Sequence, residues 1–285
     1  MALEQRLRTE ARSRGRDLAR LRQVLVFDRF LARVCGHLGA DVIVKGGVTL
    51  ELRLERARAT KDVDLWMKGD AASTLHRLQL LGQLELGDFL SFVIEPDKHH
   101  PVIQGEGVVY DGQRFRCEAR LGGKLYAGRF GVDVGFADAL TVAPDQIEGS
   151  PFLRFAGIEP ATMRIYPRVT HIAEKLHAYT IPRARENTRV KDLPDLALLA
   201  SLGGLDAAEL RDALDATFAF RKTHALPPSV PPPPLSWGPV YARMAADNDL
   251  PWRVIADLLD AVRGFLDPVL VGATGEWNPK MWGWS

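Results

Sequence analysis

Residues 42–66 constrain the fold more than any other part of the chain. The short β-branched run Val42-Ile43-Val44 is followed by the pair Gly46-Gly47. An apolar stretch of helical length at 48–54 comes next, and the alternating segment 63–66 completes the unit. β-Branched residues favour strands, and paired glycines favour a tight turn. The order therefore predicts a strand, a glycine turn, a short helix and a second strand.

The elements around this unit divide the chain into two predicted lobes. The first lobe, residues 1–150, adds two helices and three strands, expected at 17–38, 71–86, 89–94, 114–119 and 129–136. The second lobe, residues 151–285, is mainly helical, with helices expected at 170–180, 193–202, 207–221 and over much of 237–266. The sequence thus predicts an α+β fold, with a mixed-sheet lobe before a C-terminal helical lobe.

Two features of the second lobe indicate linking and packing roles. Residues 227–234 hold six prolines in eight positions, which favours an extended, semi-rigid connector over a helix. Three tryptophans follow near the C-terminal end of the sequence, at Trp277, Trp282 and Trp284. We interpret them as core or interface anchors, because large aromatic side chains dominate such packing.

Composition places the chain among globular proteins. Hydrophobic residues make up 46% and charged residues 26%, and no uninterrupted apolar run approaches the ~18 residues that span a bilayer. The opening residues 1–17 are too charged for a signal peptide, so we expect a soluble, cytoplasmic protein with no membrane partner. Cys35 and Cys117 lie far apart with no metal-type spacing, and we expect both to be buried, reduced thiols.

The formal net charge of +1 hides three locally basic segments. Seven arginines lie within residues 1–22, where solvated helix faces and an anion-binding surface are both open interpretations. The other two clusters comprise Arg53, Arg56, Arg58 and Lys61, and Arg183, Arg185, Arg189 and Lys191. Local clusters of this kind permit a polyanionic partner without demanding one.

The second strand of the glycine-turn unit carries the acidic pair Asp62 and Asp64. Residues two apart in a strand point to the same face, so the two carboxylates should lie side by side. Mg²⁺ typically takes one or two carboxylates together with waters and substrate phosphates, and Mn²⁺ accepts the same ligands. We therefore expect a magnesium site here; the interpretation rests on the ordered combination with the glycine turn, because Asp-x-Asp alone is common.

Two further features of the first lobe fit chemistry on a phosphate substrate. Gly46 and Gly47 would let the backbone approach closely just before a helix, whose N-terminal N–H groups can receive triphosphate oxygens. Asp133 alternates with Val132 and Val134 in the predicted strand at 129–136. It would complete the metal-binding set or act as general base toward an acceptor hydroxyl, while a salt-bridged strand acid is the structural alternative.

Motifs in both lobes resemble one known family. The chain resembles the AbiEii/AbiGii toxins, nucleotidyltransferases of abortive-infection and toxin–antitoxin systems, over roughly residues 40–200. The resemblance is carried by Lys45-Gly46-Gly47, Asp62-x-Asp64, Glu174-Lys175 and Lys191-Asp192-x-x-Asp195. It implies a nucleotidyltransferase-type first lobe that binds a nucleoside triphosphate through Lys45, Gly46 and Gly47.

The resemblance also implies roles for residues of the second lobe. Lys175 would contact the nucleotide's phosphates as a compact point charge, and Asp192 or Asp195 would complete the catalytic set with Asp62 and Asp64. Asp192 has an alternative role as the cap of a helix beginning near residue 193, since an aspartate often precedes a first turn that contains proline.

Two histidines near Lys175 are interpreted as packing residues. His171 and His177 have no carboxylate or cysteine at metal-ligand spacing, so we expect no zinc site.

By the same resemblance, we expect transfer of a nucleoside monophosphate to RNA, with a transfer RNA 3′ end as acceptor and a cognate antitoxin in the cell. Two other functions remain open from the sequence: transfer to a small molecule or a protein, and non-catalytic nucleotide binding. Neither alternative requires the arginine clusters.

Overall fold

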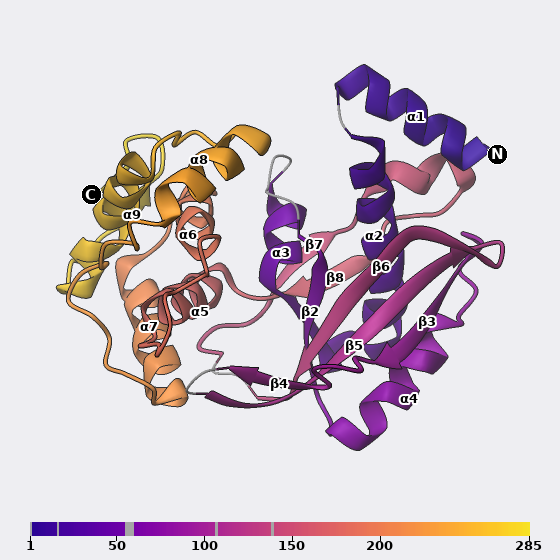
Figure 1. Ribbon diagram of the computed structural model, residues 1–285, viewed down its shortest axis with the longest axis horizontal. Helices are drawn as coiled ribbons and strands as arrows, with labels where there is room; N and C mark the ends of the chain where they lie inside the picture. Colours follow the sequence, from indigo (N-terminus) through magenta and orange to yellow (C-terminus); the bar gives the residue numbers. More distant parts are fainter. Residues whose placement is uncertain (1, 16, 55–59, 106–107, 138–139) are drawn as a thin grey trace.

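A mixed sheet flanked by helices forms one half of the molecule in the computed structural model, which describes residues 2–15, 17–54, 60–105, 108–137 and 140–285 (Figure 1). The strands are β1 (Val42–Lys45), β2 (Asp62–Met67), β3 (Leu90–Pro96), β4 (Val102–Gly105), β5 (Val108–Leu121), β6 (Lys124–Gly135), β7 (Asp145–Glu148) and β8 (Thr162–Ile165). Their order is β3-β5-β6-β2-β1-β8-β7, with β4 paired to β5. The associated helices are α1 (Ala2–Arg14), α2 (Leu18–Leu38), α3 (Gly46–Arg53) and α4 (Ala71–Gly82). These elements are called the sheet region.

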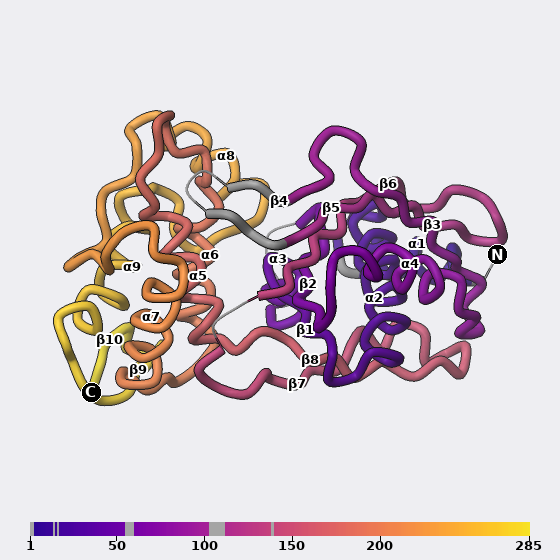
Figure 2. The backbone as a smooth tube through the Cα atoms, turned by 90° about the horizontal axis from the view of Figure 1, so that it is seen from below, coloured from indigo at the N-terminus to yellow at the C-terminus, as the bar shows by residue number. Residues whose placement is uncertain are grey.

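The second half, called the helical region, is built from five helices and a short hairpin. They are α5 (Arg168–Thr180), α6 (Asp192–Ala200), α7 (Ala207–Arg221), α8 (Trp237–Asp247) and α9 (Ile255–Leu270), with β9 (Trp277–Asn278) paired to β10 (Gly283–Trp284). Figure 2 shows the two regions at opposite ends of an elongated molecule. The predicted α+β architecture, a mixed-sheet part followed by a helical part, is confirmed.

One face of the sheet is buried under α2 and α4. Alternate residues of each strand point into this core, among them Val63 and Leu65 of β2. Phe30 of α2 packs edge-to-face against Phe92 of β3 and Phe130 of β6, with ring centroids 5.4 and 5.6 Å apart. Because side chains alternate along a strand, the opposite face of the sheet receives the polar residues of β2, β5 and β6.

Helix α3 packs into both regions of the molecule. Val48 and Leu52, four residues apart on one side of the helix, join the core of the sheet region. Leu50 and Leu54, again four apart, join the core of the helical region. Residues four apart lie on the same side of a helix, so two different sides of α3 are apolar. Figure 1 shows α3 between the two regions.

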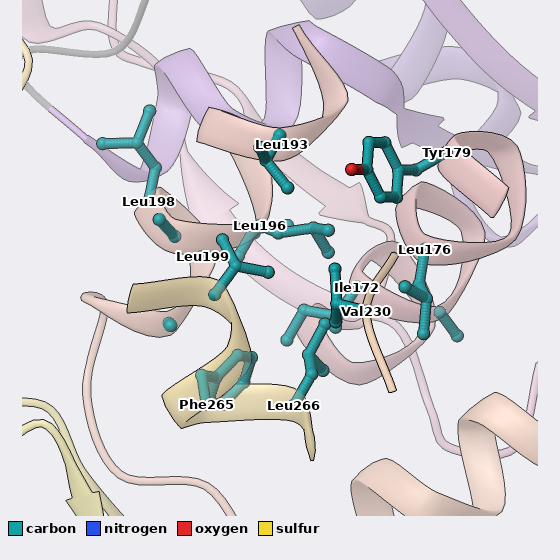
Figure 3. Close-up of a cluster of buried hydrophobic side chains, with 14 of the residues drawn as sticks. Ile172, Leu176, Tyr179, Leu193, Leu196, Leu198, Leu199, Val230, Phe265 and Leu266 are labelled. Atoms are coloured by element: carbon teal, nitrogen blue, oxygen red, sulfur yellow. The ribbon is translucent and has the colours of Figure 1, made fainter. Parts of the chain in front are cut away.

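The core of the helical region gathers side chains from α5, α6 and α9. Figure 3 shows Ile172 and Leu176 of α5 near Leu196 of α6 and Leu266 of α9, and all four are fully buried. Val230 of the proline-rich connector enters the same cluster, where its N–H donates to Asp267 Oδ1 at 2.8 Å. The connector is therefore fixed against α9 along its middle.

The tryptophans and cysteines take the packing roles expected from the sequence. Trp277 is 1% exposed and its indole N–H donates to the Ala200 carbonyl, and Trp282 and Trp284 donate to carbonyls of α9. Cys35 and Cys117 are both buried free thiols. In the described ranges, none of the helices combines the length and apolar character that a bilayer crossing requires.

Several element boundaries differ from the sequence expectations. The stretch 237–266, expected to be largely helical, contains two helices, α8 and most of α9. The helix expected to run to residue 86 ends at Gly82. Strand β8, which lies beyond residue 150 in the chain, belongs to the same sheet: its Ile165 pairs in parallel with Val44 of β1. The division of the chain at residue 150 remains a prediction.

A buried ion pair fixes α2 to the loop that leads into β3. Arg33 of α2 has a fully buried side chain, and it donates to both carboxylate oxygens of Asp88 at 2.8 and 2.7 Å. It also donates to the Leu84 and Leu90 carbonyls, and Arg29 donates to the same aspartate. Arg29 also lies 3.6 Å from the buried Asp28, so two arginines face two aspartates at this site.

We predict that Asp88→Ala lowers the free energy of unfolding by about 3–5 kcal/mol, because it leaves buried guanidinium charge uncompensated. The double variant Arg33→Met/Asp88→Leu should recover only part of this loss, because Arg29 also loses Asp88 and keeps only the more distant Asp28. Asp215→Ala, which breaks the exposed pair between Arg211 and Asp215, should stay within about 1 kcal/mol of the parent. Urea unfolding measures all three, and equal losses for Asp88→Ala and Asp215→Ala would contradict the prediction.

Candidate active site

Strand pairing brings three carboxylates together on the face of the sheet opposite α2 and α4. Asp62 and Asp64 alternate with the buried residues of β2, as the sequence predicted. The parallel register of β2 and β6 places Asp64 beside Asp133. Asp62 is exposed at the end of β2, whereas Asp64 lies partly covered. Burial, and then the charge of Asp133, raise the pKa of Asp64 to about 6, although Lys45 and Lys175 counteract this shift.

Two glycines make room for the carboxylates. Gly46 has a φ of +65°, and a Cβ at this position would overlap the Asp64 carboxylate. Gly131 of β6 lies opposite Asp62 in the register, and a Cβ there would overlap Asp62 Oδ1. The sequence analysis singled out Gly46 but missed the function of Gly131. Its role could only emerge once the pairing of β2 with β6 was known.

The residues present fit a divalent cation. Asp62 and Asp64 offer hard oxygen ligands and glycines leave space beside both; a cation would also favour the ionised form of Asp64, whose pKa is raised by burial and then by the charge of Asp133. Within the described ranges, no three acidic, histidine or cysteine side chains converge as a complete metal cage. Two carboxylates match magnesium, which takes its other ligands from water and substrate phosphates.

Asp133 is held by an arginine rather than pointing freely toward the other acids. Arg114 of β5 donates to both of its oxygens, at 2.7 and 2.6 Å. This bidentate pair is the salt-bridged alternative left open by the sequence. The assignment of Asp133 to the metal remains a prediction, and it requires exchange of the Arg114 contact.

Lys175 joins α5 to the start of α6. Its Nζ lies 2.9 Å from Asp192 Oδ1 and 2.8 Å from Asp195 Oδ2, and its side chain is only 12% exposed. Although burial alone would raise the pKa of Asp192, Lys175 and Arg189 hold it below its ordinary value. The structure thus collects the lysine and both acids of the second-lobe motifs in one charge network.

Asp192 does not act as the helix cap. Lys191 occupies the N-cap position of α6 and makes no side-chain capping bond, and Asp192 accepts from Lys175 and Arg189 instead. The sequence placed Arg189 in a basic cluster open to a polyanion, and the structure pairs its half-exposed side chain with Asp192. Its pKa is raised, mainly by Asp192, and the charge of Asp64 contributes. Arg189 therefore links the network on α6 electrostatically to the carboxylates on β2.

The other arginine-cluster residues are divided in their surroundings. Arg53 donates to the Tyr166 carbonyl and pairs with Asp145 of β7, so it connects the end of α3 to the edge of the sheet. Arg183 donates to the Ala178 carbonyl at the end of α5. Arg185 and Lys191 are exposed. Arg56 and Arg58 lie outside the described residues.

A buried histidine joins the glycine turn to α5. His171 Nδ1 lies 3.1 Å from Thr49 Oγ1, and the Thr49 hydroxyl donates to the Gly46 carbonyl at 2.8 Å. Burial, and then the charge of Lys175, lower the pKa of His171 to about 3, so the ring is neutral at neutral pH. Because His171 and Lys175 are four residues apart on α5, this contact sets where Lys175 lies relative to Gly46. His171 is a packing residue, as the sequence predicted.

The start of α3 presents backbone donors beside the acids. Lys45 occupies its N-cap position and makes no side-chain capping bond, so the first N–H groups of the helix keep their capacity for an anion. Lys45 Nζ lies 4.8 Å from the centre of the Tyr166 ring, which places a cation at the same turn. The turn therefore combines a positive helix end, a lysine and a glycine backbone next to Asp64.

Comparison with known families decides what kind of enzyme carries these residues. The family model described as "Nucleotidyl transferase AbiEii toxin, Type IV TA system" matches residues 29–268. The chain belongs to the AbiEii nucleotidyltransferase toxin family. The match covers β1, α3, β2, α5 and α6, which carry the motifs on which the sequence resemblance rested. That resemblance is confirmed, and this AbiEii-family chain is a nucleotidyltransferase of a toxin–antitoxin system.

Solved structures agree with the fold of the AbiEii-family chain. It is similar to the nucleotidyltransferase toxin MenT4 from Mycobacterium tuberculosis, with a TM-score of 0.61 and 17% identity over 97% of this chain and 92% of that one. JHP933 from Helicobacter pylori is a weaker match, with a TM-score of 0.43 and 19% identity over 72% and 82%. No curated protein sequence gives a significant match.

We predict that Gly131→Ala weakens Mn²⁺ binding by about tenfold or more, because the new methyl displaces the Asp62 carboxylate from its ligand position. The melting temperature should change little, since the displaced atoms belong to an exposed side chain. Gly36→Ala, in open space on α2, is the control and should keep the Mn²⁺ affinity. Calorimetric titration decides, and equal affinities in the two variants would contradict the assignment.

We predict that His171 makes the parent protein sensitive to acid. The folded pKa of about 3 lies below the ordinary 6.5, so stability is complete above pH 6.5 and is lost as the pH falls toward 3. Between pH 7 and 4 the parent should lose about 3 kcal/mol more than His171→Gln, which cannot titrate. Urea unfolding at both pH values tests this, with His76→Gln on the exposed side of α4 as control. A pH-independent difference between parent and His171→Gln would refute the linkage.

Proposed function

We propose that the chain transfers a nucleoside monophosphate from a nucleoside triphosphate to RNA, at the 3′ end of a transfer RNA. The observation that supports this most directly is that the charged motif residues of the sheet region and those of the helical region lie close together. Asp64, beside the Gly46 turn and two residues from Asp62, lies within electrostatic reach of Lys175 and Arg189 from the helical region. Donors for phosphate and ligands for a cation thus meet where the two regions join.

Each group has a defined part in the proposed reaction. The α3 N-terminus and Lys45 bind the triphosphate, and Asp62 and Asp64 hold Mg²⁺, or Mn²⁺ in its place. The bound cation would neutralise phosphate charge in the transition state. Lys175, positioned by Asp192 and Asp195, supplies a cation to the phosphate oxygens. The acceptor hydroxyl gives its proton to solvent as its oxygen forms a bond to the α-phosphorus, the bond between the α-phosphorus and the oxygen that bridges to the β-phosphate breaks, and pyrophosphate leaves.

The partners follow from the same proposal. The family description names a type IV toxin–antitoxin system, which supports a cognate antitoxin in the same cell. Nucleoside triphosphate is the donor. A pyrophosphate-release assay with each triphosphate, with and without cellular RNA, tests donor and acceptor together. RNA-independent release would favour a small-molecule or protein acceptor, and binding without release would indicate a nucleotide-binding module.

We predict that Asp62→Asn and Asp64→Asn each reduce transfer by at least about 100-fold while the fold persists, because both acids serve the cation and neither belongs to the core. Removing charge from a crowded acidic cluster should not lower stability. Asp212→Asn, on the exposed side of α7, is the matched control and should keep parental turnover. Radiolabelled transfer assays and thermal melting give the two readouts, and a folded Asp64→Asn protein with normal turnover would remove β2 from the mechanism.

A further inference from the structure

The carboxylate face of the sheet continues beyond the active site as a row of arginines. Arg116 and Arg120 lie on β5 and Arg129 lies on β6; these three are called the open-face arginines. Their strand neighbours Phe115, Cys117 and Ala119 point into the core, so the arginines point to the face that α2 and α4 leave uncovered. The sequence analysis did not single out any of the three.

Strand register connects this row to the catalytic acids. Asp62 of β2 lies beside Gly131 of β6, which in turn lies beside Arg116 of β5. Arg129 lies two residues before Gly131 and pairs in register with Glu118. Neighbouring strands are about 4.8 Å apart, so the arginines begin roughly 10 Å from Asp62 and extend outward from it. The row therefore starts two strands away from the proposed metal ligand Asp62.

The ion pairs on this face leave positive charge outermost. Arg116 is 55% exposed while its partner Asp97 is 10% exposed. Glu118 is 20% exposed, below Arg120 at 44% and Arg129 at 63%. The less exposed acids Asp97 and Glu118 pair with the guanidinium groups, which are the more solvent-exposed members of these ion pairs. Glu95 of β3, which is exposed and pairs in register with Arg116, offsets part of this charge, so the face is electropositive at the guanidinium groups rather than throughout.

A hollow beside the arginines adds a second binding feature. It has a volume of about 150 Å³, and its lining comprises the apolar Val93 and Pro96, the cationic Lys98, Arg116 and Arg129, the acidic Glu95 and Glu118, and His99. The apolar side chains can contact a flat base, and the three cations outnumber the two acids and can contact its phosphate. Arginine planes also stack on nucleobases, which makes the edge suitable for an unpaired strand.

We infer that the open-face arginines and this hollow bind the single-stranded end of the RNA acceptor and direct its terminal hydroxyl toward Asp62 and Asp64. The inference rests on the proposed function and names the surface that the acceptor uses. A small acceptor would need no cations beyond the reaction centre. An acidic polypeptide would match the charge, but it carries no base for the hollow.

The experiment compares two triple variants with the same change in charge. Arg116→Ala/Arg120→Ala/Arg129→Ala removes the row, and Arg154→Ala/Arg243→Ala/Arg253→Ala removes three arginines elsewhere on the surface. Binding of a single-stranded RNA oligonucleotide is measured across salt concentrations. Each phosphate contact contributes about 0.7 to the logarithmic salt slope, so the first variant should lose about 2 and the control should match the parent.

Two further variants keep the test decisive. Arg129→Ala alone changes the most exposed member and should lose about 0.7 of slope even if the triple variant folds poorly. Replacing all three arginines by lysine keeps the charge and should keep the slope. Binding of nucleoside triphosphate, measured separately, should be the same in all variants, because its ligands lie on α3, β2 and α5.

The outcomes separate this inference from the proposed function. RNA transfer by the parent with equal salt slopes in parent and row variant would overturn the inference and leave the function standing. A parent that releases pyrophosphate without binding RNA would overturn both. Binding of polyglutamate, but not RNA, through the open-face arginines would show an acidic protein surface and would also overturn the inference.

Discussion

Repulsion among carboxylates on neighbouring strands is the constraint around which the site is arranged. Asp64 and Asp133 are register partners, and Asp62 lies two residues away on the same face. Such a cluster persists only where cations surround it. Arg114 neutralises Asp133 directly, Lys45 and Lys175 favour the ionised form of Asp64, and the charge of Arg189 also interacts with Asp64. The charges that stabilise the acidic cluster therefore also link the helical region to the sheet electrostatically.

The second requirement is a fixed separation between the phosphate turn and the lysine. His171, Thr49 and the Gly46 carbonyl form a buried chain of hydrogen bonds from α5 to the turn. A neutral imidazole suits this place, because a charged ring would add to the positive charge of Lys175 and Lys45. Lys175 is itself held at its tip by Asp192 and Asp195. Both ends of the lysine side chain are thereby positioned by contacts outside its own helix.

Local patterns in the sequence carried much of this structure. Alternation of Asp62 and Asp64 with apolar neighbours, the glycine pair and the helical spacing all depend on residues close in the chain, so they could be predicted. Gly131 could not be recognised, because its role depends on pairing with a strand 69 residues earlier. The contact between Thr49 and His171 spans 122 residues, and the pairing of the exposed Arg189 with Asp192 could be seen only once α6 was placed. The roles of these residues depend on strand register and tertiary contacts, and neither leaves a pattern in the local sequence.

Helix α3 also determines how separable the two halves of the molecule are. Its Val48 and Leu52 complete one core and its Leu50 and Leu54 complete the other. A fragment containing only the sheet region would expose Leu50 to water, and a fragment containing only the helices would lack a wall of its core. The halves are therefore not interchangeable modules. Recombination of this sheet with another helical region would have to preserve the shape of one short helix, together with the phosphate turn that begins it.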